Sequence, residues 1–550
     1  MSEPGEMLEQ RARLTFKVAC EEWEFEALHR LNYRTFVEEI PQHSANAEGR
    51  LVDRFHNENT YFICLDGQRL VGMVAARGNR PFSLDKKLPE LDSYLPPGRK
   101  ILEIRLLAIE PEYRSGFILL GLFRHLFRHI RASGYDLGIM SGTLRQESLY
   151  RRLGFVPFGP LVGSGDATYQ PMYLTLEDFQ GQSRDLVSDF PPVRLMPGPV
   201  TVADNVRAAL AEQPASHRAE SFVENFQLLR AQLCRLTGSR SAQILLGTGT
   251  LANDVIAGQL SLQAEPGLIL SNGEFGERLI DHAARFKLPF EVFRVDWGQA
   301  FSEAALRDAV KLAPHLKWLW AVHCETSTGV LNGIDVLERI CDDAGMKLCL
   351  DCVSSLGTVP TDLSRVYLAS SVSGKGLRGS SGLAFVFYRH APQPEPERLP
   401  RYLDLGFYAV HDGVPFTQSS NLVKALGIAL ENVDWSERFR DLASLSSWLR
   451  AELAGRGLTV VALGEHASPG VITLALPSQV CSESLGRQLE QSGYLLAYRS
   501  EYLLARNWIQ ICIMGAVARS DLIGLLAALS AQVGATQKES RSPLLDMVGA

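Results

Sequence analysis

Lys375 lies in a setting where a lysine amine can act as a reactive group rather than as a surface charge. The loop around it, residues 371–382, consists almost entirely of small residues and precedes an apolar run that predicts a strand. An amine held there can form a covalent bond to an aldehyde carbon. The other interpretation is a solvated turn lysine beside glycines, so Lys375 needs support from other residues.

Asp351 provides such support. It ends a short apolar run, residues 347–351, that predicts a buried strand followed by small residues. Pyridoxal phosphate (PLP) needs an anion beside its pyridine nitrogen, because the protonated ring is the better electron sink. The lysine and the acid together make a PLP enzyme the first hypothesis, although an Asp that caps the next segment is an alternative for Asp351 alone.

A third segment, residues 242–256, runs from an apolar strand through a Gly-Thr-Gly-Thr turn into a predicted helix. Backbone N–H groups at the start of the helix and the hydroxyls of Thr248 and Thr250 can hold a phosphate dianion. The turn lacks the terminal lysine of a P-loop and the spacing of a dinucleotide fingerprint. It therefore does not indicate a nucleotide site.

The order of these three segments resembles the class V aminotransferases of PLP fold type I, especially the alanine–glyoxylate and 2-aminoethylphosphonate–pyruvate transaminases. The resemblance covers most of residues 191–520 and extends to four further segments in matching order, 195–199, 216–218, 272–278 and 323–331. It implies an α/β fold in which a large domain with a mixed seven-stranded sheet is followed by a small C-terminal α/β domain.

The resemblance also implies roles for individual residues. Lys375 would bind the cofactor covalently and carry a proton between it and the substrate α carbon, while Asp351 would pair with the ring nitrogen. The remaining matches would be Thr248, Gly249 and Thr250 at the phosphate, Phe275 and Val353 on the two ring faces, and Thr326 and Ser327 near the 3-hydroxyl or the substrate.

Some of these residues have simpler interpretations when they are considered alone. Phe275 and Val353 could be ordinary core side chains, and Thr326 and Ser327 could belong to a hydroxyl-rich turn. Thr417, in segment 416–421, resembles the part of the family by which a neighbouring subunit completes the phosphate site. The resemblance therefore implies a homodimer.

One position departs from the family pattern. The family carries an arginine near the C terminus that grips the substrate carboxylate, and the matching residue here is the uncharged Gln510. In an extended strand Arg506 would project to the same side as Gln510, and Arg499 is another candidate for the missing cation. Either the carboxylate is held differently, or the substrate has another anionic group, or ordinary amino-acid transamination does not occur.

The first third of the chain predicts a separate domain, since 550 residues exceed what one core normally organises. Helical periodicity covers 21–36, a hairpin with an Asp-Gly turn covers 60–74, and a strand at 101–109 leads into a helix that ends near 133. The Asp- and Pro-containing stretch 187–193 predicts the junction. We expect three parts: 1–188, 189–536 and a flexible tail, 537–550.

The first part resembles a GNAT acyltransferase, in the branch of the autoinducer synthases and N-acyl amino acid synthases, over about residues 10–180. Glu103 and Arg105 could position an acceptor or pair with each other on a strand. Arg114 and Gly116 begin the loop where GNAT proteins bind the pyrophosphate of acetyl-coenzyme A. Tyr150 could protonate a leaving thiolate or simply pack.

Two small positions of that loop are bulky in this chain, Phe117 and Leu119. Similar changes occur in relatives that take acyl groups from acyl carrier protein. Acyl-coenzyme A and acyl carrier protein therefore both stay open as donors, and so does a domain that has lost acyl transfer and serves as a substrate-binding or structural module.

Composition points to a cytoplasmic enzyme. The net charge of −7 provides no basic surface for nucleic acid, no apolar run is long enough to span a membrane, and the acidic N terminus lacks a signal-peptide core. We therefore expect neither nucleic acid nor a membrane as partner. Cys349 and Cys352 have C-x-x-C spacing but flank Asp351 on a predicted buried strand, so no metal is expected.

The sequence thus predicts a PLP-dependent aminotransferase that moves an amino group from a small donor, of the alanine, serine or 2-aminoethylphosphonate type, to a keto or aldehyde acceptor. The N-terminal domain could N-acylate the amine, which would make the protein bifunctional. Two alternatives remain: a PLP-dependent lyase, decarboxylase or desulfurase, or chiefly an N-acyltransferase whose second domain is a scaffold.

Overall fold

The computed structural model describes residues 13–164, 167–178 and 192–539. The chain divides into two compact units. Unit 1 comprises the described residues of 1–193 together with 488–494 and 518–550, and unit 2 comprises 194–487 and 495–517. Most of the predicted junction at 187–193 lies outside the described residues, and so do residues 540–550 of the predicted tail at 537–550.

Unit 1 is built on a mixed eight-stranded sheet with the order β1-β2-β3-β4-β5-β8-β6, in which β7 also pairs with β8. The predicted hairpin is confirmed, and Gly67 adopts a left-handed φ of 61° in its turn. The strands are β1 (Leu14–Val18), β2 (Thr60–Asp66), β3 (Arg69–Arg77), β4 (Ile101–Ile109), β5 (Leu137–Thr143), β6 (Val156–Pro157), β7 (Val162–Ser164) and β8 (Ala167–Thr175).

The helices of unit 1 cover this sheet. The predicted first helix is α2 (Glu22–Tyr33), which continues as a π-helical segment, Arg34–Glu39. The second is α3 (Gly116–Ala132), whose apolar face packs against β1, β2 and β3, and α4 (Glu147–Arg152) follows β5. The last helix of the chain, α17 (Arg519–Glu539), also packs against α3 and β1.

Strand β4 contains a local irregularity directly after Arg105. Ala75 pairs with Arg105 and Met73 pairs with Ala108, so β4 has one residue more than β3 between these pairs. Leu106, inside this bulge, has a left-handed φ of 52°. The extra residue of such a bulge interrupts the regular alternation of side chains between the two faces of the strand.

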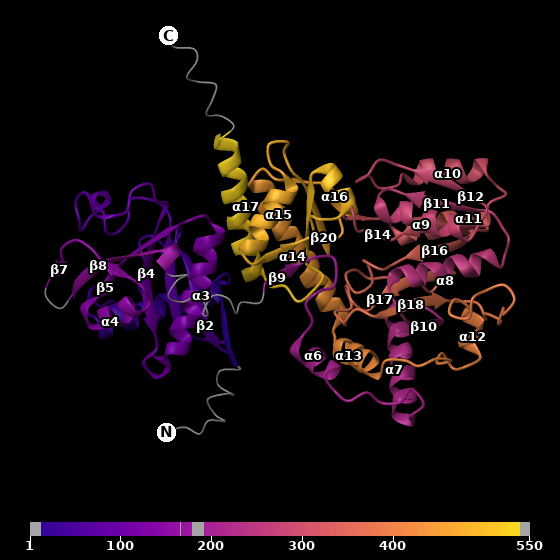
Figure 1. Cartoon of the computed structure of the whole chain (residues 1–550), viewed down its shortest axis with the longest axis horizontal. Helices are drawn as coiled ribbons and strands as arrows, with labels where there is room; N and C mark the ends of the chain where they lie inside the picture. The colour runs from indigo at the N-terminus through magenta and orange to yellow at the C-terminus, as the bar shows by residue number, and fades with distance from the viewer. Residues whose placement is uncertain (1–12, 165–166, 179–191, 540–550) are drawn as a thin grey trace, which may run out of the picture. The chain divides into compact units, whose positions relative to one another are not determined.

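Unit 2 contains the predicted seven-stranded mixed sheet, in the order β10-β18-β17-β16-β13-β11-β12 (Figure 1). The six other strands run in one direction, and β18 runs in the opposite direction between β10 and β17. The strands are β10 (Ser241–Leu246), β11 (Gly267–Ser271), β12 (Phe290–Arg294), β13 (Trp318–Val322), β16 (Lys347–Asp351), β17 (Leu368–Val372) and β18 (Leu383–Tyr388).

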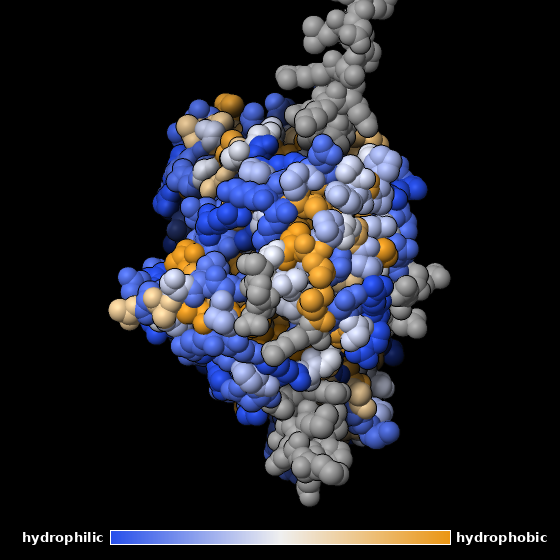
Figure 2. All heavy atoms as spheres, turned by 90° about the vertical axis from the view of Figure 1, so that its left-hand side faces the viewer, coloured by the Kyte–Doolittle hydropathy of each residue, from blue (hydrophilic) through white to orange (hydrophobic). Residues whose placement is uncertain are grey.

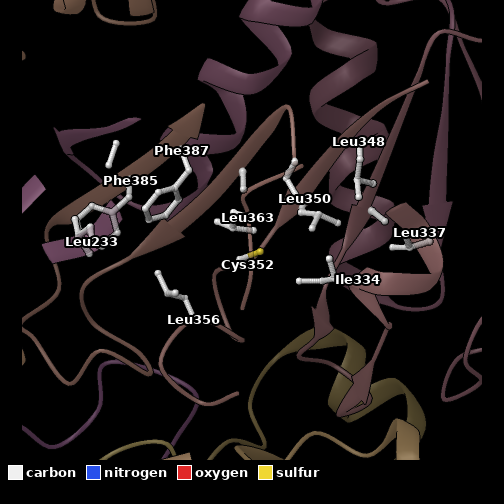
Figure 3. Close-up of a cluster of buried hydrophobic side chains, with 14 of the residues drawn as sticks. Leu233, Ile334, Leu337, Leu348, Leu350, Cys352, Leu356, Leu363, Phe385 and Phe387 are labelled. Atoms are coloured by element: carbon white, nitrogen blue, oxygen red, sulfur yellow. The ribbon is translucent and has the colours of Figure 1, made fainter. Parts of the chain in front are cut away.

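Both faces of this sheet are covered by helices, so its strands are apolar on both sides. On β13, Leu319 belongs to one core cluster and Trp318 and Trp320 to the other. Figure 3 shows the first cluster, where Leu337 lies near the β16 side chains. The covering helices are α7 (Glu220–Thr237), α10 (Glu303–Leu312) and α11 (Ile334–Ala344) on that face, and α8 (Gly249–Ser261) and α9 (Glu274–Arg285) on the other.

A smaller α/β part with a three-stranded sheet, β19-β20-β22, completes unit 2 and matches the expected small C-terminal domain. Its elements are β19 (Thr459–Val460), β20 (Val471–Ala475), β22 (Trp508–Cys512), α14 (Trp435–Gly455) and α16 (Glu501–Arg506). The remaining elements are α6 (Asp204–Leu210), β14 (Cys324–Glu325), β15 (Val330–Leu331), α12 (Leu405–Ala409) and α13 (Ser420–Leu430), with β9 (Val193–Leu195), α15 (Ser482–Gln491) and β21 (Tyr494–Leu496) where the chain passes between the units.

The surface in Figure 2 is largely hydrophilic, with apolar side chains in small patches. Across the described ranges, the helices include none that is both long enough and apolar enough to cross a membrane.

We predict that Leu337→Ala destabilises unit 2 by about 2–5 kcal/mol, because the side chain is 2% exposed in the core and its removal leaves a cavity. Leu228→Ala is the matched control, since this helical leucine is 61% exposed and its loss should change stability by no more than about 0.5 kcal/mol. Urea unfolding followed by intrinsic fluorescence measures both. Equal effects of the two substitutions would contradict the described core.

Candidate active site

The predicted site residues of unit 2 converge because the parallel strands end at one edge of the sheet. Asp351 ends β16, Lys375 follows β17, and Thr248 follows β10. Asp351 lies beside Val322 of β13 and Ser370 of β17 in the strand register. The carboxyl edge of such a sheet is where open α/β folds bind ligands.

Lys375 is partly buried, and a chain of hydroxyl groups holds its amine. Its Nζ lies 2.9 Å from Ser354 Oγ, and Ser354 Oγ in turn shares a hydrogen bond with Thr326 Oγ1. The amine is also 5.6 Å from the centre of the Phe275 ring. Burial lowers the pKa of Lys375, while the nearby Asp351 acts in the opposite direction. Compared with an ordinary lysine, this amine therefore loses its proton more readily and is more nucleophilic.

Asp351 is buried and receives two hydrogen bonds. Asn253 Nδ2 donates to Oδ2 at 2.8 Å, and the backbone N–H of Val353 donates to Oδ1 at 2.9 Å. The Ser370 hydroxyl donates to Asn253 Oδ1 at 2.6 Å, which sets the orientation of the amide. Burial raises the pKa of Asp351, and the Asn253 hydrogen bond opposes this. The sequence analysis assigned no role to Asn253, which lies inside the 242–256 segment, or to Ser370, which directly precedes the 371–382 loop.

The Gly-Thr turn lies at the start of α8. Thr248 occupies the N-cap position with extended backbone, and its side chain makes no capping hydrogen bond. A Cβ at Gly249 would lie 2.9 Å from the Val353 side chain, so glycine permits the close approach of α8 to that residue. The helix start thus leaves N–H groups and the hydroxyls of Thr248 and Thr250 for an anion.

Glu325 sets the position of Phe275. Its carboxylate is fully buried and accepts hydrogen bonds from the N–H groups of Phe275 and Gly276, at 3.1 and 3.0 Å, at the start of α9. The N–H and hydroxyl of Ser327 donate to the same carboxylate. Burial raises the pKa of Glu325, which these hydrogen bonds oppose. The sequence indicated a turn here but not this function of its acid.

Arg278 is a cation of this site that the sequence analysis did not single out. Its guanidinium lies 4.7 Å from the centre of the Phe275 ring. The positive charge of Arg278 also contributes to the lowered pKa of Lys375. Its Nε donates to Glu274 at 3.1 Å, and its side chain is 53% exposed. Arg278 can therefore reach an anionic group that approaches from solvent.

The three residues predicted to replace the family arginine lie in different surroundings. The prediction that Arg506 extends β22 is wrong, because Arg506 ends α16 and Asn507, with a left-handed φ of 55°, separates it from the strand. Its guanidinium stacks 3.5 Å from the Trp297 ring centre. Arg499 donates to the Tyr498 hydroxyl at 3.1 Å, and Gln510 is fully buried. Thr417 lies exposed in the loop before α13.

In unit 1, Glu103 and Arg105 form one charged network. The Arg105 guanidinium donates to Glu103 at 3.1 Å and to Asp53 at 2.8 Å. Glu103 is 1% exposed and also accepts from the backbone N–H groups of Ser83 and Leu84. A carboxylate with this many donors is held rigidly. The sequence analysis named the pair but missed Asp53, which lies about fifty positions away in the chain.

The ring of Phe55 lies at the centre of further cations in this network. The guanidinium groups of Arg54, Arg77 and Arg105 are 4.4, 3.7 and 4.8 Å from its centre. Arg77 also pairs with Glu58, and Arg105 pairs with Asp53 and Glu103, so Phe55 packs inside a network of paired charges.

The other predicted acyltransferase residues lie in different contacts. Arg114 pairs with Glu39 and donates to the Ile109 carbonyl, and Gly116 is the first residue of α3. Tyr150 is 3% exposed in the unit 1 core, where its hydroxyl donates to Gln146 at 2.7 Å. This burial raises the pKa of Tyr150 to about 12.

The donor set of the unit 2 site fits PLP. It contains a buried carboxylate for a protonated ring nitrogen, an amine of lowered pKa for an aldehyde, an aromatic ring beside that amine, and a helix start with free hydroxyls for a phosphate. Within the described ranges, no group of three or more His, Cys, Asp or Glu side chains is placed to hold a metal ion.

Comparison with known proteins finds matches in both parts of the chain. Residues 205–400 match the model of the family Aminotransferase class-V, and residues 27–175 match that of N-acyl amino acid synthase FeeM. The chain is 29% identical over 360 residues to the soluble hydrogenase 42 kDa subunit of Anabaena cylindrica, which covers 61% of this chain and 91% of that protein. It is 27% identical over 305 residues to the 2-aminoethylphosphonate–pyruvate transaminase of Pseudomonas aeruginosa, covering 52% of this chain and 81% of that protein.

Solved structures resemble unit 2 in the same way. The alanine–glyoxylate aminotransferase from Nostoc sp. is 28% identical with a TM-score of 0.56, covering 62% of this chain and 95% of that chain. An aspartate aminotransferase from Thermus thermophilus is 27% identical with a TM-score of 0.56, covering 62% and 99%. Both family resemblances predicted from the sequence are confirmed. The chain therefore joins a region that matches the N-acyl amino acid synthase model, at 27–175, to a region that matches the class V aminotransferase model, at 205–400.

Proposed function

We propose that this protein is a PLP-dependent aminotransferase that moves an amino group from a small donor to a keto or aldehyde acceptor. The observation that carries this proposal is the presence of Lys375 and Asp351 at one sheet edge, with opposite pKa shifts that share one cause, burial. The match of residues 205–400 to the class V aminotransferases supports it.

Each residue of the site has a task in such a reaction. When bound, PLP supplies an aldehyde that bonds to amines and a ring that takes up the electron pair of the substrate Cα–H bond. Lys375 Nζ is the base that moves the proton at Cα, because its pKa is lowered and Ser354 orients it. Asp351 holds the ring nitrogen, and Asn253 fixes Asp351. Thr248, Gly249 and Thr250 hold the phosphate at the start of α8.

The half-exposed cation Arg278, beside the Phe275 ring, indicates the class of amino donor. Arg278 can bind a carboxylate or phosphonate of the donor, which suits alanine, serine or 2-aminoethylphosphonate. The relatives include a protein named 2-aminoethylphosphonate–pyruvate transaminase. The resemblance of segment 416–421 to a subunit-bridging segment supports a homodimer in which Thr417 completes the partner's phosphate site.

We propose N-acyl transfer as the second activity, with unit 1 as its site. The match of residues 27–175 to the N-acyl amino acid synthases supports it, as does the rigidly held Asp53–Arg105–Glu103 network. Acyl-coenzyme A or acyl carrier protein would supply the acyl group. Fusion of the two regions raises the effective concentration of the amine made by one at the other.

We expect Lys375→Ala to lose the visible absorbance that PLP gives on the wild-type protein, and aminotransfer to fall by about 10³-fold or more, because the amine both binds the cofactor and moves the proton. Borohydride reduction and peptide mass spectrometry should locate the pyridoxyl group on Lys375. Lys424→Ala, which changes an exposed lysine paired with Glu212, is the control. Bound PLP that no amino donor converts to pyridoxamine phosphate would favour a lyase instead.

Arg278→Gln should raise KM about tenfold for alanine and for 2-aminoethylphosphonate, equivalent to about 1.4 kcal/mol, with little change in kcat. Arg285→Gln is a matched control on the same helix, because Arg285 is also exposed and paired with an acid four residues earlier. Steady-state kinetics with both donors decides the question. The same KM in both variants would exclude Arg278 from donor binding.

Arg105→Gln should reduce thiol release from acyl-coenzyme A or acyl carrier protein by about 10²-fold, since Asp53 and Glu103 lose the cation that holds them together. Arg151→Gln, which removes an exposed pair with Glu147, should have no effect. Thiol release that persists in Lys375→Ala would show that unit 1 works independently. Full activity of Arg105→Gln would argue against the network as the acyl-transfer site.

A further inference from the structure

Gln510 sits at the centre of β22 with its side chain fully buried. Its Nε2 donates to the Thr326 carbonyl at 2.5 Å, to the Ser327 carbonyl at 3.2 Å and to Thr473 Oγ1 at 2.9 Å. Its Oε1 accepts from the Tyr502 hydroxyl at 3.4 Å. Both amide hydrogens are therefore engaged by protein acceptors.

These contacts join the small sheet of unit 2 to the turn that follows β13. Thr326 extends from this turn to Ser354 and, through it, to the Lys375 amine. Ser327 extends to Glu325, which holds the backbone at Phe275. One carboxamide thus sets the position of the turn from which both the hydroxyl chain of Lys375 and the ring beside it are held.

The same contacts leave Gln510 unable to bind a substrate carboxylate. A carboxylate needs free donors, and the amide hydrogens are already bonded to the carbonyls of Thr326 and Ser327 and to Thr473. The fully buried Glu325 belongs to the same turn, so a second anion here would meet a carboxyl group.

We propose that Gln510 is a positioning residue that fixes the 325–327 turn, and through it the Lys375 amine and the Phe275 ring, and that the anionic group of the amino donor binds elsewhere. This inference rests on the proposed aminotransferase function. It also specifies how the amino donor is recognised. The anionic group of the donor would bind the exposed cation Arg278 and not a buried side chain at position 510.

The test compares L-alanine with alaninamide, which has the same amine but no carboxylate. Gln510→Met keeps the length of the side chain and removes the donors, and Gln510→Glu keeps its shape and removes the NH2 group. On the PLP-loaded full chain, both variants should lower kcat about 10- to 100-fold for both donors alike, with the ratio of the two KM values unchanged. A rise in KM for alanine alone would overturn the proposal.

Gln510→Arg sharpens the comparison, because it introduces a cation at this position. A positioning role predicts the same loss of kcat as in Gln510→Met and no gain in KM for alanine. An arginine that lowers KM for alanine about tenfold relative to alaninamide would instead place the donor carboxylate at residue 510 and overturn the proposal.

A second readout needs no cofactor and no activity. In PLP-free protein, carbamylation of Lys375 by cyanate, measured by peptide mass spectrometry against Lys424 in the same sample, reports the local setting of the amine. Gln510→Met should change the ratio at least about threefold, since the hydroxyl chain loses its anchor. An unchanged ratio would overturn positioning even if wild-type protein failed to bind PLP, in which case the aminotransferase proposal would fail separately.

Thr473→Val covers the possibility that the Gln510 variants do not fold. Thr473 Oγ1 accepts from Gln510 and donates to the Ser327 carbonyl at 3.2 Å, so its loss loosens the same turn while residue 510 remains a glutamine. Circular dichroism and thermal unfolding verify the fold. We expect a smaller change of the carbamylation ratio in the same direction, and a folded variant with the wild-type ratio and wild-type kcat would overturn the proposal.

Discussion

Unit 2 depends on one constraint: polar groups buried at the carboxyl edge of its sheet have little water and must bond to one another. Asp351 meets this requirement through Asn253, and Glu325 through the N–H groups at the start of α9. An unpaired buried acid would cost several kcal/mol, of the order of 1–3 per lost hydrogen bond and more for a charge. The need to satisfy Glu325 therefore ties the start of α9 to the turn that carries this acid.

The same burial that makes these groups costly also makes them useful. Removal of water lowers the pKa of Lys375 and raises that of Asp351, and the attraction between the two opposes both shifts. An amine that loses its proton more readily is a better base and nucleophile, while an acid held by two donors stays in one orientation. Rigid hydrogen bonding from Ser354, Asn253 and the backbone at Val353 supplies the geometry in which the proposed chemistry occurs.

Unit 1 satisfies its buried acid with a cation in addition to hydroxyl and N–H donors. Glu103 is buried in the sheet, and Arg105, two residues later on the same strand, reaches both it and Asp53. The β3–β4 ladder is regular from Glu103 to Arg105, so these two residues lie on the same face of the strand, and the extra residue of β4 comes after them. The buried Arg77, which also lies beside the Phe55 ring, pairs with Glu58. The two regions thus bring different chemistries into one chain.

The sequence by itself determined the elements and the residues that end them. Apolar runs predict strands, and Asp351, Lys375 and the Gly-Thr turn follow such runs, so their meeting at one sheet edge could be predicted from local pattern. Only the tertiary structure decided the partners: Asn253 meets Asp351 across 98 positions, and Gln510 meets Thr326 across 184. It also decided that Arg506 ends a helix and that α17, expected in the second domain, packs against α3 of unit 1. The reason is physical, since such contacts depend on how distant segments pack and no local periodicity encodes them.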